Sequence, residues 1–324
     1  MLGDFNHRLS APYNRLTQEL FVDTNGSASS LFNTTADLIG CHPYYPAPID
    51  HILAGGFQSS YVSLHSQTHK FDNMKVDDML SDHCAVTVSI SAQPLPLSPA
   101  VKWLTTSKEY QFLTQDTYQQ AGSTLEQVSS QKDNWVVVMD VDETILDNSP
   151  YQVSLDKTGA SYITETWEDW VKQASAGLVP GAAAFIQTVL DKGGKLVLIT
   201  NREKEVESYT WQNLRALGLP LTPSNTCLLG RAEADKRAID GKAMINDKDL
   251  RRQQVEMGNA PCYRPQTPST SMQQWSRSQQ ILMHVGDNIK DFPSMTQEDA
   301  DIADVLLQQP RTFILLPNPM YGSW

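Results

Sequence analysis

Beyond residue 130 the chain alternates four short apolar runs with helix-forming segments, and this alternation constrains the fold more than any other feature. The runs are residues 135–139, 195–199, 281–285 and 312–316, and they carry several β-branched side chains. Apolar runs without polar alternation are typical of strands buried on both faces, as in a parallel sheet covered by helices.

The segments between these runs show helical spacing. Residues 182–190 are predicted to form a helix that ends before Gly193, and residues 205–217 a second helix closed by Gly218. The order strand, helix, strand, helix, strand predicts an α/β domain with a doubly wound parallel sheet. In such sheets ligands bind at the carboxyl ends of the strands, so the residues there are the candidates for a functional site.

The composition of the chain changes near residue 95. Six of the seven histidines precede this point, and all seven tryptophans follow it. The change coincides with a proline-rich stretch, which favours extended backbone and is typical of a linker. We therefore expect three parts, namely residues 1–93, a linker over residues 94–99 and a domain over residues 100–324.

The chain has 25 basic and 37 acidic residues, a formal net charge of −12. This charge argues against binding of polyanions, so no nucleic-acid partner is expected, although a bound divalent cation can reverse the local field for a small phosphate substrate. No stretch approaches the roughly 20 apolar residues of a membrane span. The four cysteines lack C-x-x-C spacing, so neither a zinc knuckle nor a thioredoxin-like pair is indicated, and they suit either redox compartment.

The ends of three predicted strands carry four carboxylates, a hydroxyl and an amide, in residues Asp140, Asp142, Thr200, Asn201, Asp287 and Asp291. A helix-capping turn would account for an Asp or a Thr at any one of these positions. Four carboxylates at one sheet edge would repel one another, and a hard cation such as Mg²⁺, which prefers oxygen ligands, compensates them. The sequence therefore predicts a magnesium site at this edge.

These residues resemble the haloacid dehalogenase superfamily of phosphohydrolases, whose motifs are D-x-D, a threonine, a lysine and G-D-x-x-x-D. Residues 140–152, 199–202, 286–292 and 317–324 resemble more closely the class C acid phosphatases, which include the outer-membrane lipoprotein 5′-nucleotidases. The resemblance covers residues 98–324, including a helical lead-in. It implies a Mg²⁺-dependent acid phosphatase or 5′-nucleotidase whose partner is a small phosphomonoester, with a nucleoside monophosphate favoured.

The resemblance also implies roles for the acidic residues. Asp140 would attack phosphorus and form an aspartyl-phosphate. Asp142 would protonate the leaving oxygen and then deprotonate the hydrolytic water. The Asp140 carboxylate, the Asp142 backbone carbonyl and Asp287 would hold Mg²⁺, and Asp291 would support these ligands.

The phosphoryl group also needs contacts opposite the metal. By resemblance, Thr200 and the Asn201 amide would hydrogen-bond the phosphoryl oxygens. The family places a lysine in a K-x-x-R-R-like turn, which Lys248 fits. Lys236 and Lys242 are competitors because this region is longer than the family pattern, but for both of them a solvated surface charge is the favoured interpretation.

Trp167 and Trp170 are three residues apart in a predicted helix, so they share a face. Core packing is the simpler interpretation, and we adopt it for Trp170. For Trp167 the resemblance implies a stacking wall for a nucleobase, with Tyr321 as a partner. His284 lies inside a predicted strand and is expected to be a core or second-layer histidine.

Other features concern the context of the domain. Residues 231–247 and 260–279 are interpreted as insertions relative to the family pattern. The chain shows no export or lipidation signal, so as written it is cytoplasmic, whereas the resemblance implies a periplasmic, outer-membrane or secreted protein. The sequence does not specify an oligomeric state.

In the first part, motifs containing Asp4, Asn6, Asp82 and His83 resemble the last motifs of the endonuclease/exonuclease/phosphatase superfamily. The metal-binding Glu and one catalytic His of that superfamily have no counterpart in this segment. Residues 1–93 are therefore expected to be a truncated α+β sandwich fragment with a vestigial site. There are two alternatives to a phosphomonoesterase. One is a metal-dependent phosphodiesterase or nuclease whose active site lies in this segment, and the other is a non-catalytic binding protein.

Overall fold

The computed structural model describes residues 2–4, 32–33, 50–54, 62–69, 84–92, 94–128, 134–240, 244–265 and 275–324. The chain divides into two compact units, Met1–Leu95 and Pro96–Trp324. The described strands of the first unit form two antiparallel sheets. One contains β1 (Leu2–Asp4), β3 (Asp50–Ala54) and β2 (Phe32–Asn33), and the other pairs β4 (Val62–His69) with β5 (Ala85–Ala92).

The second unit is built around a five-stranded parallel sheet with the strand order β10-β9-β6-β11-β12. Its strands are β6 (Trp135–Met139), β9 (Lys195–Glu203), β10 (Thr226–Arg231), β11 (Gln280–Gly286) and β12 (Phe313–Leu315). Because the first strand is central and the chain winds outward from it in both directions, the carboxyl ends of β6, β9 and β11 are neighbours. This order confirms the predicted doubly wound α/β fold.

Each of the four predicted apolar runs forms a strand of this sheet. The edge strand β10 was not predicted, because only Cys227, Leu228 and Leu229 are apolar in succession there. Strand β9 continues to Glu203, four residues beyond its apolar run, and so carries Thr200, Asn201 and Arg202 at its carboxyl end.

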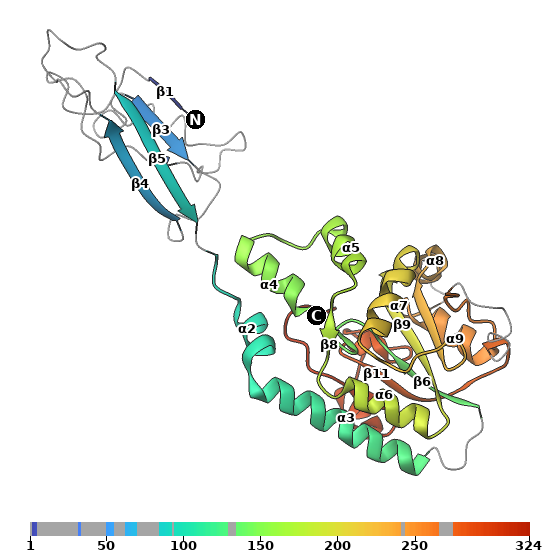
Figure 1. The fold of residues 1–324 in the computed structure, drawn as a ribbon. Coiled ribbons are helices and arrows are strands. Elements are labelled where there is room, and N and C mark those ends of the chain that lie inside the picture. Colours follow the sequence, from blue (N-terminus) through green and yellow to red (C-terminus); the bar gives the residue numbers. More distant parts are fainter. Residues whose placement is uncertain are drawn as a thin grey trace, which may run out of the picture. The chain divides into compact units, whose positions relative to one another are not determined.

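Alternate strand residues face opposite sides of the sheet, and each side has its own apolar core. On one side, Val137, Leu198 and Val285 pack against α3 (Lys108–Val128), α6 (Ala182–Asp191) and α7 (Glu207–Ala216). Helices α3 and α6 lie side by side beneath the sheet (Figure 1). This side holds the larger of the two cores.

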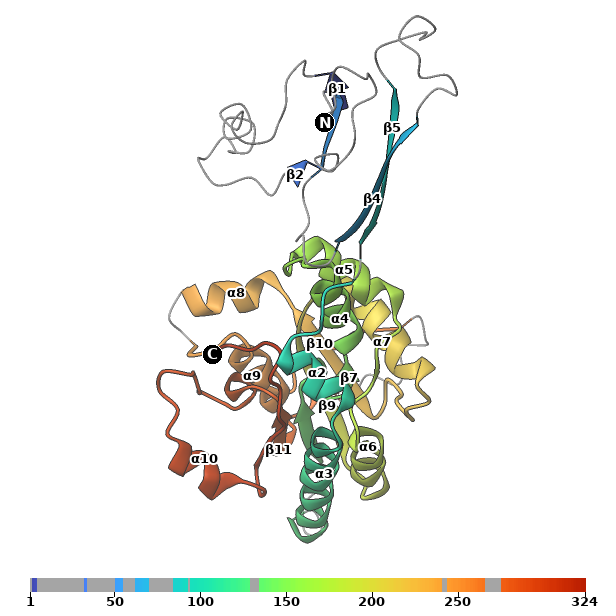
Figure 2. The same cartoon turned by 90° about the vertical axis from the view of Figure 1, so that its left-hand side faces the viewer.

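On the other side, Val138 and Ile199 pack against α9 (Asp249–Met257) and Trp275. Figure 2 shows α9 and α6 on opposite sides of the strands. A disulfide between Cys227 and Cys262 ties β10 to the loop that follows α9. The sequence spacing of the cysteines did not reveal this pair, because the two residues come together only through the sheet.

A segment inserted between β6 and α6 lies directly after the first strand. It runs through β7 (Leu146–Asp147), α4 (Ser149–Thr158), α5 (Thr164–Gln173) and β8 (Gly177–Leu178), and β7 pairs with β8 in antiparallel fashion. This pairing closes the segment at its base. Helices α4 and α5 are thereby held at the carboxyl end of β6 (Figure 1).

Two helices begin at other residues than the sequence predicts, and a third was not predicted. Pro99, assigned to the linker, lies in the first turn of α2 (Pro99–Thr106), where its missing amide costs nothing and Ser98 caps the helix. The helix predicted over residues 205–217 is a 3₁₀ turn, η4 (Lys204–Val206), followed by α7. Residues 231–247, interpreted as an insertion, contain α8 (Glu233–Asp240).

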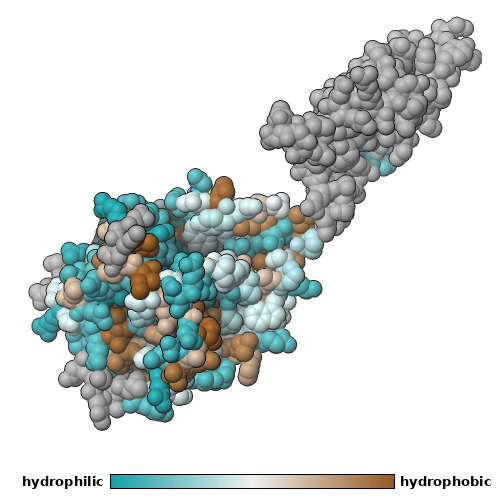
Figure 3. Space-filling view, turned by 180° about the vertical axis from the view of Figure 1, so that it is seen from behind, coloured by the Kyte–Doolittle hydropathy of each residue, from teal (hydrophilic) through white to brown (hydrophobic). Residues whose placement is uncertain are grey.

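After β11 the chain forms η6 (Ile289–Asp291) and α10 (Ile302–Gln308) and returns to the sheet as β12. Hydrophobic and hydrophilic residues are interspersed on the face of this unit seen in Figure 3. Among the described residues, no helix combines the length and apolar character needed to cross a membrane.

Candidate functional site

A pocket of about 830 Å³ lies at the carboxyl edge of the parallel sheet. Its walls include residues from the ends of four strands, namely Asp140 after β6, Arg202 at the end of β9, Arg231 at the end of β10 and Asp287 after β11. The sheet order brings these ends together, as the doubly wound topology requires. The described pocket therefore occupies the place where such folds bind ligands.

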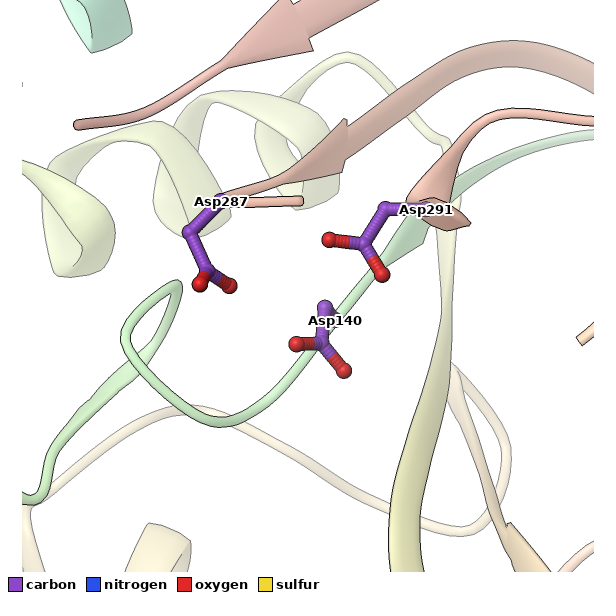
Figure 4. Close-up of side chains that lie close together, drawn as sticks. All are labelled: Asp140, Asp287 and Asp291. Carbon is purple, nitrogen blue, oxygen red and sulfur yellow. The ribbon is translucent and has the colours of Figure 1, made fainter. Parts of the chain in front are cut away.

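Three carboxylates share a small space in this pocket. Each of Asp140, Asp287 and Asp291 offers an oxygen atom, and these atoms all lie within 4.8 Å of one another. Figure 4 shows the three carboxyl groups turned toward a common space, one from the chain after β6 and two from the chain after β11. A buried lysine, Lys248, lies beside them, with its Nζ 2.6 Å from Asp140 Oδ1 and hydrogen-bonded to Asp291 Oδ1.

The crowding of charge shifts the ionisation of these groups. Burial raises the pKa of Asp140 well above its usual range, and Asp291 and Asp287 raise it further against the opposing effect of Lys248. Burial lowers the pKa of Lys248, but Asp140 and Asp291 outweigh it, so the net pKa is raised and the ammonium stays charged. Burial and the neighbouring carboxylates therefore disfavour the ionised form of Asp140 while no cation is bound, despite the contact with Lys248.

Asp287 is held by two neutral donors. Thr144 Oγ1 donates to Asp287 Oδ1 at 3.1 Å, and Asn318 Nδ2 donates to Asp287 Oδ2 at 2.9 Å. Burial, with Asp291 adding to it, raises the pKa of Asp287 to about 7. Each carboxylate oxygen keeps a second lone pair for another ligand.

Asp142 lies apart from these three carboxylates in its hydrogen bonding. Its Oδ1 accepts from Arg202 Nε at 2.8 Å and from Asn148 Nδ2 at 2.9 Å, and it lies 2.7 Å from an Arg202 terminal nitrogen. Its Oδ2 accepts from Thr200 Oγ1 at 3.0 Å. Arg202 is almost fully buried, so this is a desolvated, two-pronged guanidinium–carboxylate pair.

Thr200 and Asn201 lie at the carboxyl end of β9, next to the pocket. The Thr200 hydroxyl donates to Asp142, and the Thr200 backbone oxygen accepts from Arg251 Nη1 at 2.5 Å. Asn201 lines the pocket, and its Oδ1 accepts from Arg251 Nη2 at 2.9 Å. Arg251 thus fixes the end of the strand that carries both residues.

The structure separates two of the three candidate lysines. Lys248 is 4% exposed and contacts Asp140, whereas Lys236 is half-buried and forms ion pairs with Glu203 of β9 and Glu233 of α8. Lys242 lies outside the described residues. Of the described candidates, Lys248 is the one that reaches the carboxylate cluster.

Two aromatic residues, one on α5 and one after β12, line part of the pocket. Trp167 and Tyr321 both border it, and the Arg202 guanidinium lies 5.7 Å from the centroid of the Trp167 ring. Trp170 packs against the larger core, as expected, and its indole Nε1 donates to Asn148 Oδ1 at 2.9 Å. His284 is buried within β11, as predicted.

Of the four residues singled out in the first part of the chain, the structure describes Asp4. Asp4 lies in β1 opposite Asp50 of β3. Asn6, Asp82 and His83 lie outside the described residues. The vestigial site thus stays a prediction from sequence.

Sequence reasoning assigned no role to three residues that the structure brings to the site. Arg202 was part of the I-T-N-R motif, and its position two residues after Thr200 on the same strand could have placed it beside Asp142. Asn148 and Asn318 lie in residues 140–152 and 317–324, which also resemble the family, but their partners Asp142 and Asp287 are identified only in the folded loops.

A five-stranded parallel sheet whose carboxyl edge presents a carboxylate cluster beside a buried lysine defines a phosphohydrolase of the haloacid dehalogenase type. Residues 73–324 match the family model described as "HAD superfamily, subfamily IIIB (Acid phosphatase)". The chain belongs to this family of acid phosphatases, which are phosphomonoester hydrolases.

Solved structures agree with this assignment. The class C acid phosphatase from Bacillus anthracis is 27% identical over 69% of this chain and 84% of its own, with a TM-score of 0.55. A second structure of that enzyme, with tungstate bound, matches at the same identity and coverage with a TM-score of 0.54. The comparisons do not support the predicted resemblance of the first part to the endonuclease/exonuclease/phosphatase superfamily.

Proposed function

We propose that the protein is a Mg²⁺-dependent phosphomonoester hydrolase that works through an aspartyl-phosphate on Asp140, with nucleoside monophosphates as preferred substrates. The observation that carries the proposal is the meeting of Asp140 with Lys248, Asp287 and Asp291 at the carboxyl edge of the sheet. Covalent phosphoryl transfer needs a carboxylate nucleophile, a positively charged side chain such as Lys248, and oxygen ligands for a metal ion.

The carboxylate cluster fits a hard divalent cation. Its oxygens lie close together in a buried place, and a bound cation would favour the ionised forms of Asp140 and Asp287, whose pKa values burial raises. Asp140, Asp287 and the Asp142 backbone carbonyl would hold the ion, with Asp291 supporting them through Lys248 and the Asn288 amide. When bound, the ion would neutralise charge on the phosphoryl oxygens.

The remaining chemistry belongs to two carboxyl groups. An Asp140 oxygen attacks phosphorus, and the bond from phosphorus to the ester oxygen breaks while Asp142 gives its proton to that oxygen. Asp142, now a carboxylate, takes a proton from the water that attacks the aspartyl-phosphate. Inorganic phosphate leaves, and both residues return to their starting state.

Other pocket residues bind the substrate. Lys248 faces Asp140 and would contact the phosphoryl oxygens together with Asn201 and Thr200. Trp167 and Tyr321 offer aromatic faces for a base, and stacking on such faces is tolerant of base identity. These aromatic faces support the preference for nucleotides over simple esters.

The first test is hydrolysis of 4-nitrophenyl phosphate by the full-length chain. Mg²⁺ should support turnover, EDTA should abolish it, and renewed Mg²⁺ should restore it. Asp140→Asn should reduce turnover to background, whereas Asp169→Asn, at an exposed carboxylate on α5, should leave it unchanged. Full activity in EDTA would contradict the metal assignment, and wild-type rates for Asp140→Asn would contradict the covalent step.

A second test addresses the substrate. Trp167→Ala should raise KM for a nucleoside 5′-monophosphate about 10-fold, because base stacking contributes roughly 1–3 kcal/mol, and leave KM for glycerol 2-phosphate unchanged. Equal changes for both substrates would contradict base stacking. Tungstate, which the related Bacillus anthracis enzyme binds, should compete with both substrates.

A further inference from the structure

Asn148 precedes the first turn of α4, a position where an asparagine side chain usually accepts a hydrogen bond from the helix backbone. Here the side chain makes no such capping bond. The side chain is completely buried, and its hydrogen bonds go to groups outside the first turn of this helix. Its place in the fold is therefore not explained by the helix that it precedes.

The side-chain amide of Asn148 makes five hydrogen bonds, three through its nitrogen and two through its oxygen, and the longest runs from Nδ2 to the Leu146 carbonyl at 3.5 Å. Its Nδ2 donates to Asp142 Oδ1 at 2.9 Å and to Glu143 Oε2 at 3.2 Å. Its Oδ1 accepts from Trp170 Nε1 at 2.9 Å and from an Arg202 terminal nitrogen at 3.1 Å. Two carboxylates thus face its donor end, and two N–H donors face its acceptor end.

This arrangement fixes the orientation of the amide. A flipped amide would set its oxygen against two carboxylates and its NH₂ group against two donors, leaving buried polar groups unpaired. The backbone N–H of Asn148 adds a bond to Glu143 Oε1 at 2.8 Å, and Glu143 adopts a left-handed φ of 54°, which turns the loop back on itself. Asn148 consequently has one stable pose relative to Asp142.

That pose distinguishes the two oxygens of Asp142. Oδ1 receives Asn148 and both prongs of Arg202, whereas Oδ2 has one partner among the described residues, the Thr200 hydroxyl. A proton placed on Oδ1 would meet donors, so the carboxylic acid form of Asp142 must carry its proton on Oδ2. The oxygen free to give a proton to a substrate is therefore Oδ2.

We propose that Asn148 is a positioning residue, which holds Asp142 so that Oδ2 delivers the proton to the leaving oxygen and which links this pose to helix α5 through Trp170. Trp167, on the same helix, lines the pocket and lies over Arg202. The assignment rests on the proposed function, in which Asp142 is the proton donor. It assigns to α5 a second task beside contacting the substrate.

The test compares two esters that differ in their need for a proton. The 4-nitrophenolate ion leaves without protonation, whereas an alkoxide such as that of glycerol 2-phosphate does not. Asn148→Asp keeps the shape of the side chain but sets a third carboxylate against Asp142 and Glu143. It should lower kcat/KM for glycerol 2-phosphate about 100-fold, the size of loss that misplaced groups produce, and for 4-nitrophenyl phosphate far less.

Trp170→Phe removes one donor to the Asn148 oxygen and retains an aromatic ring. It should shift the ratio of the two kcat/KM values in the same direction, by a few-fold. The matched control is Asn213→Ala, since Asn213 is equally buried but bonds the backbone of Ala176. This control should lower thermal stability and leave the ratio unchanged.

Equal losses on both esters in Asn148→Asp would overturn the proposal, because a general loss of structure affects both alike. If Asn148→Asp does not fold, Trp170→Phe decides, and an unchanged ratio there would also overturn it. A wild-type protein that hydrolyses neither ester would instead refute the proposed function itself.

Discussion

At the scale of single residues, Asp287 links pH to metal binding. Its pKa is raised from 3.8 to about 7, so in the cation-free protein it gives up its proton only as pH rises toward 7. A carboxyl group whose pKa is higher in the folded protein than in the unfolded chain stabilises the fold at any pH below its unfolded pKa. For Asp287 this stabilisation is lost as the pH rises from about 3.8 to 7. Mg²⁺ should therefore raise Tm little at pH 5 and clearly at pH 8.

Asp287→Asn should remove this pH-dependent gain, because the amide neither titrates nor offers a second anionic oxygen. Asp169→Asn, at the exposed carboxylate on α5, provides the control and should retain the wild-type response. Thermal unfolding with and without Mg²⁺ at the two pH values measures the effect. A Tm gain that is equal at pH 5 and pH 8 would be incompatible with this role of Asp287.

His284 titrates in the opposite sense. Burial, aided by Arg252, lowers its pKa from 6.5 to about 3, so the folded protein keeps the ring neutral where the unfolded chain would protonate it. Stability is then lost as pH falls from 6.5 toward 3, at about 1.4 kcal/mol per pH unit. His284→Leu should reduce the drop in Tm between pH 7 and pH 5.

His65→Gln is the control for His284, since His65 is exposed in β4. It should leave the drop in Tm as it is in the wild type. An unchanged drop in His284→Leu would show that other groups dominate acid unfolding.

The acidic residues of the pocket could be predicted because they directly follow apolar strands, where local sequence and fold topology coincide. Lys248 could be proposed from its turn, although geometry was needed to set it apart from Lys236. The bonds of Asn148 to Trp170 and Arg202 could not be predicted, since these partners are 22 and 54 residues away and meet only after α5 and β9 are in place.

At the scale of elements, the junction after β11 has almost no spare room. A Cβ added at Gly286 would lie 2.1 Å from Asp291 Oδ2, so Gly286→Ala must displace Asp291 and its contact with Lys248. We expect a loss of about 1–3 kcal/mol in the free energy of unfolding, typical of overpacking, and a smaller gain in that free energy when Mg²⁺ is added. Both follow from one urea titration series with and without the ion.

Gly177→Ala in β8 is the matched control, because a Cβ there would meet nothing within 4 Å. It should change neither stability nor the response to Mg²⁺ by much. If the two alanine variants behaved alike, close packing of Asp291 against the strand end would not be the reason for the glycine.

Strands could be predicted from the sequence where burial on both faces makes nearly every side chain apolar. The central strand β6 is a continuous apolar run and β11 is mostly apolar, interrupted by His284, so the sequence indicated burial on both faces. The edge strand β10 has a shorter run, and its pairing with β9 supplies what its own sequence does not show. The η4 turn before α7 directly follows the end of β9, and the helical spacing of residues 205–217 does not indicate it.

At the scale of the whole molecule, the described parts of the proposed catalytic site come from one unit. The pocket residues lie between Asp140 and Ser323, all within Pro96–Trp324. Residues 1–95 contain 4 basic and 9 acidic side chains, a net charge of 4 − 9 = −5. The first unit thus carries a net negative charge of its own.

The full-length protein should therefore hydrolyse monoesters and leave DNA, RNA and bis(4-nitrophenyl) phosphate intact in Mg²⁺ or Mn²⁺. An acidic chain with a net charge of −12 repels a polyanion, because nucleic-acid binding depends on neutralising phosphates with basic residues. His83→Ala should leave monoester turnover unchanged, while Asp140→Asn should abolish it. Diester cleavage that disappears in His83→Ala but survives Asp140→Asn would show that the first unit carries a second, independent hydrolase.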